Sequence, residues 1–189
     1  MKAIQIANDK TLVWADFDKP VPGEHEVLIK VAATAINRAD LVQRSGGSPP
    51  PPGASPIMGL ECAGEIAAVG ANCSRYKEGD KVCALLAGGG YAEYVVASEG
   101  SVLPIPNGMS LTQAAGIPEV FATAWLNLYM EARIKPGEKV VLHAGASGVG
   151  TAAIQICRIK AIKTFVTVGS DHKIDACLRL GASGGVNRH

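Results

Sequence analysis

The sequence predicts a mixed β and α/β fold class, with a barrel or sandwich of short strands up to about residue 109 and a parallel sheet with helices after it. Short apolar and β-branched stretches recur in the first part, between turn signals such as PVPGEHE, KEGD and GGG. After Pro106, strand-like and helix-like stretches alternate with short turns, which is the pattern of a parallel sheet. We therefore expect two domains, residues 1–118 and 119–189.

The elements of the first domain follow from these signals in chain order. The expected strands are KAIQI, TLVWADF, EVLIKVAATAI, the apolar run at residues 64–69, KVCALL, YAEYVVA and SVLPIP. A single helix, NRADLVQR, interrupts them, and Asn37 can cap its first turn. The loop after it, GGSPPPPGASP, favours polyproline II, which is typical of a stiff surface connector more often than of an SH3-type ligand.

The second domain begins with helices and continues as alternating strands and helices. Ser110 caps a short helical patch over residues 110–117, and Pro118 opens a helix that we expect to run to Arg133. The expected elements after it are the strand KVVLHA, a helix at residues 147–159, the strand TFVTV, the helix DHKIDACLRL and a third strand, GGVN.

Composition excludes several classes of function. The net charge is +1 and no run of Lys and Arg is longer than two, so we expect no nucleic-acid partner. The five cysteines are odd in number and contain no C-x-x-C pair, which indicates buried free thiols in a reducing compartment. The chain shows neither the hydrophobic region of a signal peptide nor a stretch long enough to span a bilayer. These patterns predict a cytoplasmic protein with no membrane partner.

The glycine-rich turn HAGASGVGTAAIQ resembles three kinds of site at first inspection. A P-loop would need Lys and then Ser or Thr where Thr151 and Ala152 stand, and a nucleophile elbow would need glycine where Val149 stands. A dinucleotide fingerprint remains, because Gly148-x-Gly150-x-x-Ala153 fits G-x-G-x-x-G/A between a predicted strand and a predicted helix. A tight strand-to-helix turn that binds no ligand is the alternative.

Glycine in such a turn allows the backbone to approach a pyrophosphate, and the N–H groups and dipole of the following helix offset the phosphate charge. The residues expected to bind the cofactor here are Gly145, Ser147, Gly148, Val149 and Gly150.

The residues after the second strand indicate which dinucleotide binds. An NAD site usually has Asp or Glu at the end of this strand, whereas TFVTV is followed by Gly169 and Ser170. Ser170, Lys173 and Arg188 can supply the hydroxyl and cationic groups that an adenosine 2′-phosphate requires, so we favour NADPH. NAD stays open, because a register change of one residue would make Asp171 the ribose-binding acid.

Five ordered stretches resemble one family: NRADLVQR, GLECAGEI, EGDKVCALLAGGGYAEYV, LTQAAGIPEVFATAW and HAGASGVGTAAIQ. Together they are similar to the zinc-independent quinone oxidoreductases of the medium-chain dehydrogenase/reductase superfamily, and most similar to the p53-inducible type. The resemblance implies a GroES-like β-barrel domain followed by a Rossmann domain, the cofactor and substrate meeting between them. It also implies hydride transfer from NADPH to a quinone without metal, and a homodimer in full-length members.

Site residues are carried over from this resemblance position by position. Asn37 and Gln43 are expected near the nicotinamide or the substrate. Pro118, Glu119 and Thr123 are expected where a helix passes the cofactor, although Asn37 can equally be a helix cap and Thr123 a core residue. Ser48 stands near the position at which relatives carry a cleft tyrosine, which alters the expected substrate range. His143 is assigned no proton-transfer role. Zinc-using relatives carry Cys at the position of Asn37 and His at that of Leu60, and neither residue here is a zinc ligand.

The resemblance also sets an expectation about extent. A doubly wound sheet of this kind has six strands, and the chain reaches only the third, so we expect an incomplete Rossmann domain and a C-terminally truncated enzyme. The alternative is a catalytically inactive short isoform or fragment, with a regulatory role or none.

Overall fold

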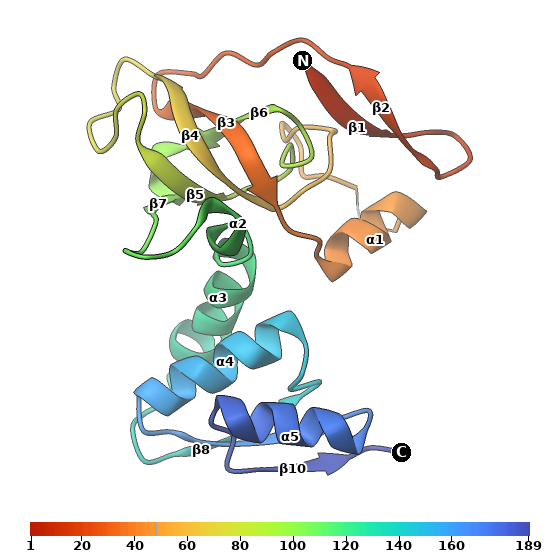
Figure 1. The fold of residues 1–189 in the computed structure, drawn as a ribbon, viewed down its shortest axis with the longest axis vertical. Coiled ribbons are helices and arrows are strands. Elements are labelled where there is room, and N and C mark those ends of the chain that lie inside the picture. Colours follow the sequence, from red (N-terminus) through yellow and green to blue (C-terminus); the bar gives the residue numbers. More distant parts are fainter. Residues whose placement is uncertain (48) are drawn as a thin grey trace. The chain divides into compact units, whose positions relative to one another are not determined.

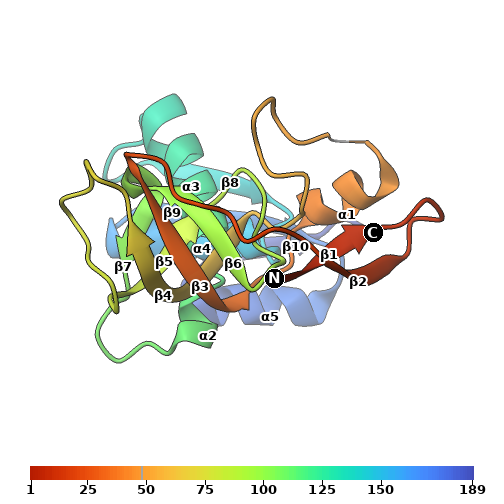
Figure 2. The ribbon, with the colours of Figure 1, turned by 90° about the horizontal axis from the view of Figure 1, so that it is seen from above.

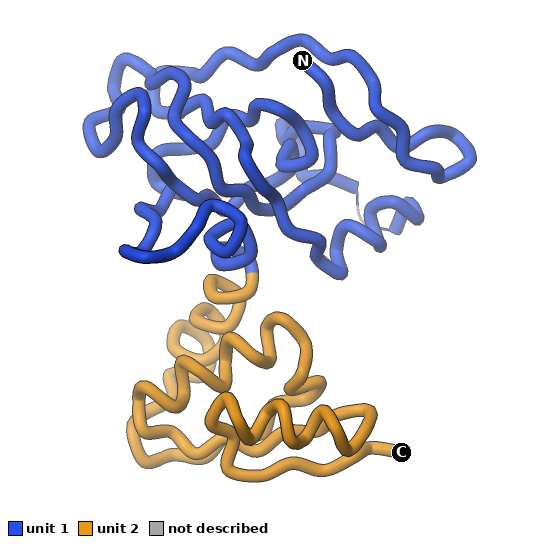
Figure 3. The backbone as a smooth tube through the Cα atoms, in the orientation of Figure 1, with its two compact units in different colours: residues 1–119 blue, residues 120–189 orange. Residues whose placement is uncertain are grey.

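A computed structural model describes residues 1–47 and 49–189. The chain divides into two compact units, Met1–Glu119 and Val120–His189, coloured separately in Figure 3. Each unit has hydrophobic clusters of its own. Over the described residues, no helix combines the length and the hydropathy that a membrane span requires.

Unit 1 is built on a curled, five-stranded antiparallel sheet with the strand order β6-β3-β4-β5-β7 (Figures 1 and 2). Its strands are β3 (Glu26–Thr34), β4 (Glu61–Val69), β5 (Lys81–Leu85), β6 (Tyr94–Ser98) and β7 (Val102–Pro104). The pairing of β3 with β4 shifts register between Leu28 and Ile29 and again between Val31 and Ala33, and such bulges bend a sheet. The largest hydrophobic cluster of this unit buries Ile29, Ile66 and Val82.

Smaller elements surround this sheet. A separate hairpin, β1 (Lys2–Ile6) and β2 (Leu12–Asp16), is tied to the sheet region by the N–H of Ile4, which donates to the carbonyl of Tyr91 at 2.8 Å. Helix α1 (Arg38–Ser45) lies beside the hairpin, and Nε of Arg44 donates to the carbonyl of Lys10 at 2.7 Å. A 3-10 turn, η1 (Glu99–Ser101), precedes β7, and Ser110 caps the short helix α2 (Leu111–Ala114).

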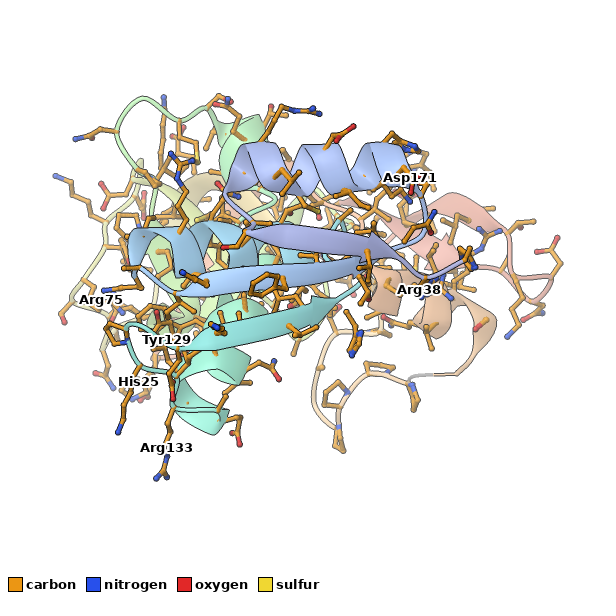
Figure 4. The ribbon with its side chains drawn as sticks, turned by 90° about the horizontal axis from the view of Figure 1, so that it is seen from below. His25, Arg38, Arg75, Tyr129, Arg133 and Asp171 are labelled. Carbon is orange, nitrogen blue, oxygen red and sulfur yellow. The ribbon has the colours of Figure 1, made fainter. Side chains whose placement is uncertain are left out.

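Unit 2 is a three-stranded parallel sheet covered by helices on one face. The strand order is β10-β9-β8, so the third, second and first strands of the unit lie side by side in that order. This is the 3-2-1 order of one half of a doubly wound sheet. The elements are β8 (Lys139–His143), α4 (Gly148–Ile159), β9 (Lys163–Val168), α5 (Asp171–Leu180) and β10 (Gly184–Asn187). Ile154 of α4 and Cys177 of α5 pack on Val166, on the buried face of β9. The other face, turned to the viewer in Figure 4, exposes Val141, Phe165 and Val186.

The mixed fold class is confirmed by this arrangement. The helix predicted from Pro118 to Arg133 is present as far as Glu131, but its type changes along its length, since α3 (Pro118–Trp125) continues as a π-helical segment, η2 (Leu126–Glu131). The wider turn is visible in the bond from the N–H of Ala132 to the carbonyl of Asn127, five residues earlier. At the same place Nδ2 of Asn127 donates to the carbonyl of Thr123, and such side-chain insertion perturbs the α-helical ladder.

Candidate functional site

The turn between β8 and α4 occupies residues 144–147 and reverses the chain tightly. Ala144 has a left-handed backbone, with φ of 54°, directly after the strand. Ser147 is the N-cap of α4, and its Oγ accepts from the N–H of Gly150 at 3.1 Å while its carbonyl accepts from the N–H of Thr151 at 2.8 Å. The cap therefore satisfies the third and fourth N–H groups of the helix.

Glycine is required in this turn by packing within the chain. A Cβ on Gly150 would lie 2.4 Å from the carbonyl oxygen of Gly145, and one on Gly145 would lie 2.4 Å from the side chain of Val166. A Cβ on Gly148 would lie 2.9 Å from Cγ1 of Val120. The first two distances are shorter than any real contact, so helix α4 can start this close to β8 and β9 only with glycine at these positions.

Two N–H groups at the start of α4 are open to a ligand. Among the described residues, nothing accepts a hydrogen bond from the N–H of Gly148 or of Val149, and Gly148 is exposed. These are the first N–H groups of a twelve-residue helix, where the helix dipole adds partial positive charge. The turn therefore fits a phosphate or pyrophosphate group.

The residues expected to select the cofactor lie where β9 meets α5. Ser170 is the N-cap of α5, and its buried Oγ has no hydrogen-bond partner among the described residues. Lys173 and Arg188 are exposed, and the N–H of Arg188 donates to the carbonyl of Val168, which places Arg188 beside the end of β9. Asp171, labelled in Figure 4 at the start of α5, accepts from Nδ2 of Asn187 at 3.1 Å.

In unit 1, a cluster of polar side chains surrounds the start of α1. The N–H of Asn37 donates to Oδ2 of Asp40 at 2.7 Å, and Nδ2 of Asn37 donates to Oε1 of Glu61 at 2.8 Å. The hydroxyl of Tyr91 donates to the same Oδ2 of Asp40 at 2.8 Å. Asp40 and Glu61 are 2% and 1% exposed, so two carboxylates are buried around one asparagine.

Burial also decides the protonation chemistry near this cluster. Burial, followed by the hydrogen bond and the charge of Asp40, raises the pKa of Tyr91, so its hydroxyl stays a donor at neutral pH. Burial, with smaller contributions from Cys83 and Glu61, raises the pKa of the Cys62 thiol to about 12. Neither group is a source of protons or of a nucleophilic thiolate near neutral pH.

Comparison with known proteins places both units in one family. Residues 23–107 match the alcohol dehydrogenase GroES-like domain. The mouse (Mus musculus) quinone oxidoreductase is 36% identical over 169 residues, covering 89% of this chain and 51% of that protein. A crystal structure of Escherichia coli quinone oxidoreductase complexed with NADPH superposes with a TM-score of 0.85 at 30% identity, covering 98% of this chain and 57% of that one. This chain belongs to the medium-chain dehydrogenase/reductase superfamily.

Within the superfamily the similarity is to quinone oxidoreductases and also to enoyl reductases. The CurK enoyl reductase superposes with a TM-score of 0.90 at 32% identity, covering all of this chain and 60% of that one. The chain spans about half the length of the curated quinone oxidoreductases that it matches, from 51% to 57%.

The remaining predicted residues of this superfamily member are placed as follows. Gln43 is half-buried on α1, and Thr123 is half-buried on α3, where its carbonyl accepts from Asn127. Ser48 lies outside the described residues. Nδ1 of His143 lies 3.1 Å from Oγ1 of Thr167 on the neighbouring strand. Among the described residues, no group of three or more His, Cys, Asp or Glu side chains could hold a metal ion.

Sequence reasoning missed Asp40, Glu61 and Tyr91. Two signals in the sequence could have found the carboxylates. Glu61 stands in GLECAGEI between the apolar residues Leu60 and Cys62, where an acidic side chain is unusual. Asp40 stands three residues after the predicted cap Asn37, the spacing of a capping box. Nothing in the sequence links Tyr91 to either of them, since it follows 51 residues after Asp40.

Proposed function

We propose that this chain carries the NADPH-binding turn and the substrate-side groups of a zinc-independent quinone oxidoreductase. The observation that carries the proposal is the start of α4, where the N–H groups of Gly148, which is exposed, and of Val149, which is half-buried, have no acceptor in the described chain. The similarity to quinone oxidoreductases supports it. When bound, NADPH would supply the hydride; this chain's residues bind and orient.

The pyrophosphate would be held by backbone groups of the turn. Gly148 and Val149 would donate their N–H groups, and Ser147 would keep the helix start in place through its bond to Gly150. The close packing of Gly145 and Gly150 fixes the turn before any ligand arrives, so little reorganisation is needed on binding.

Selection of NADPH over NADH would rest on three side chains near the end of β9. Ser170 offers a hydroxyl without a partner in the described chain, and Lys173 and Arg188 are exposed cations. Charge-assisted hydrogen bonds from such groups suit a 2′-phosphate. Asp171, the competing ribose acid, already accepts a hydrogen bond from Asn187.

On the substrate side we propose Asn37, Gln43 and Ser48. Asn37 belongs to the buried polar cluster of unit 1, and Gln43 is half-buried one turn or more along the same helix. A quinone is a strong hydride acceptor, so the protein needs only to orient it, exclude water and donate hydrogen bonds to its oxygens.

Binding of cofactor fragments tests the adenine end without requiring catalysis. We expect calorimetric titration to give tighter binding for adenosine 2′,5′-bisphosphate than for 5′-AMP. Lys173→Ala should weaken the bisphosphate roughly tenfold, since a hydrogen bond to a charged group is worth about 1.5–3 kcal/mol, and leave 5′-AMP unchanged. Lys160→Ala, an exposed lysine at the other end of α4, is the matched control. Equal or tighter binding of 5′-AMP by the unmodified chain would favour NADH.

The TM-score of 0.90 with an enoyl reductase makes enoyl reduction a second candidate. Both reactions require a hydride donor and an oxygen that gains negative charge, so the same turn and polar cluster could serve either. NADPH oxidation measured with a simple quinone and with an enoyl thioester in parallel separates them. Turnover of the thioester alone would move the assignment to the enoyl reductases.

A further inference from the structure

We propose that Glu61 is a positioning residue that orients the side-chain amide of Asn37, leaving one N–H of Nδ2 as the donor that Asn37 presents to an oxygen of the substrate. The inference deepens the proposed function and rests on it, because it takes Asn37 as a substrate-side group. It names the chemistry that this position recognises: a hydrogen-bond acceptor such as a carbonyl oxygen.

The burial of Glu61 is the first step of the argument. Its side chain is 1% exposed, and the one ion pair among the described residues, Lys2 with Asp16, lies elsewhere. A carboxylate buried without a cation is stabilised only by the N–H groups that it accepts from. Packing alone does not explain a buried carboxylate at the start of β4, so we look for a role in its hydrogen bonds.

Both oxygens of the Glu61 carboxylate accept a hydrogen bond, and the two bonds together hold the group in one orientation. Oε2 accepts from the N–H of Glu119 at 2.9 Å, and Oε1 accepts from Nδ2 of Asn37 at 2.8 Å. Glu119 is the second residue of α3, which begins with Pro118, so its N–H has no acceptor within the helix. The helix start therefore holds the carboxylate plane in one orientation, and Oε1 is offered to Asn37 at a fixed place.

This carboxylate decides which way the Asn37 amide is turned. The oxygen and nitrogen of an amide are usually hard to tell apart, but Oε1 of Glu61 is the acceptor at this contact, so the nitrogen of Asn37 faces it. The opposite oxygen, Oδ1, faces the N–H of Asp40 in a capping-box arrangement, although without the alignment of a true hydrogen bond. Asp40 in turn fixes the backbone of Asn37 through the 2.7 Å bond to its N–H.

One donor of the Asn37 side chain is then left over. Nδ2 carries two hydrogens, of which Glu61 takes one. With the oxygen directed to the start of α1, the second hydrogen is the side chain's remaining donor, and Asn37 is itself partly exposed. A carbonyl oxygen of the bound substrate is the kind of acceptor that such a donor holds in place.

The test uses Glu61→Gln, which keeps the shape of the side chain but replaces one acceptor with an NH₂ group. If that group faces Asn37, two donors meet and the amide must turn over. We expect the KM for a simple quinone to rise about tenfold, with a smaller change in kcat. A tenfold change corresponds to the loss of one hydrogen bond to a charged group. Glu65→Gln, an exposed glutamate on the same strand, is the matched control and should change neither. In an Asn37→Ala background, Glu61→Gln should add nothing further to the KM.

A second readout does not depend on activity. In the full chain, the side-chain NH₂ signals of Asn37, identified by their loss in Asn37→Ala, should move in the ¹⁵N–¹H spectrum of Glu61→Gln and stay in place in Glu65→Gln. Unmoved Asn37 signals, or additive effects of Glu61→Gln and Asn37→Ala on KM, would overturn the positioning role. Moved signals in a chain that reduces no quinone would instead uphold the orientation of the amide and refute the proposed function.

Discussion

The thiol of Cys62 shows at the residue scale how burial sets chemistry. It lies on β4 next to Glu61, is fully buried, and has its pKa raised from 9.0 to about 12. A buried thiol that stays protonated behaves as a small apolar group. The prediction of buried free cysteines therefore holds for this residue, and also for Cys83, Cys157 and Cys177.

This raised pKa gives a pH-dependent stability with a definite sign. Between about pH 9 and pH 12 the unfolded chain releases the Cys62 proton and the folded chain keeps it, so stability falls as pH rises. The contribution is fully present below pH 9.0 and amounts to a loss of about 1.4 kcal/mol at pH 10. Urea unfolding from pH 8 to pH 10 should show a shallower decline in Cys62→Ala. Cys73→Ala, at a half-buried position, is the comparison, and parallel declines in all three chains would contradict the assignment.

At the scale of elements, the start of α4 combines a structural cap with the proposed phosphate-binding surface. Ser147 holds the helix start through its Oγ, and the neighbouring N–H groups of Gly148 and Val149 stay open. Stability and phosphate binding therefore depend on different atoms of the same turn, and a single substitution can separate them.

Ser147→Asp is the substitution that does so. Asp is as good an N-cap as Ser, and its charge is favourable at a helix start, so the unfolding free energy should stay within about 0.5 kcal/mol. Its carboxylate would repel a pyrophosphate, so titration with NADPH should show binding weakened at least about tenfold. Ser147→Ala should do the reverse, losing about 1 kcal/mol of stability and less affinity. Undiminished NADPH binding by Ser147→Asp would exclude this turn as the phosphate site.

The elements also show what sequence patterns can and cannot predict. The strands of both units and the helices α1, α4 and α5 were predictable, because their apolar periods, caps and glycine turns are local signals. The π-helical segment after Trp125 was not, because it depends on where the side chain of Asn127 donates and on the stacking of Trp125 on Tyr129, with ring centroids 4.4 Å apart. The p53-inducible type stays a prediction.

The same distinction applies to the candidate site. The dinucleotide turn is one contiguous segment, so its residues could be named from spacing alone. The polar cluster of unit 1 joins residues that are distant in the sequence, and only folding brings them together. Its hydrogen-bonded pairs are Asn37 with Glu61, Asp40 with Tyr91 and Glu61 with Glu119, and the last pair is 58 residues apart. The predicted role of Gln43 stays untested, and Ser48 is not among the described residues.

At the scale of the whole molecule, the chain is two compact units with separate hydrophobic clusters, Met1–Glu119 and Val120–His189 (Figure 3). Units with their own cores can open independently. A ligand that binds one of them stabilises that unit directly, by about 2.7 kcal/mol at a concentration a hundred times its Kd.

Hydrogen exchange can therefore locate the cofactor in the chain. Adding adenosine 2′,5′-bisphosphate should slow amide exchange in β8, α4, β9 and α5 of unit 2 and leave β3, β4 and β5 of unit 1 unchanged, as followed by mass spectrometry of peptides. The Ser147→Asp chain should show clearly weaker protection at the same ligand concentration. Equal protection in both units would contradict the assignment of the dinucleotide to unit 2.

The hydrogen bond between Asp171 and Asn187 has a consequence for cofactor engineering. Asp171 is the residue that would bind the ribose if the alternative NAD interpretation held. Its carboxylate also accepts from Nδ2 of Asn187 at 3.1 Å, which links the first turn of α5 to the strand β10. Replacing Asp171 to alter the contacts to the ribose would therefore also remove its hydrogen bond to Asn187 on β10. A change in the preference between NADPH and NADH is better sought at Lys173, which is exposed and can be replaced without removing that hydrogen bond.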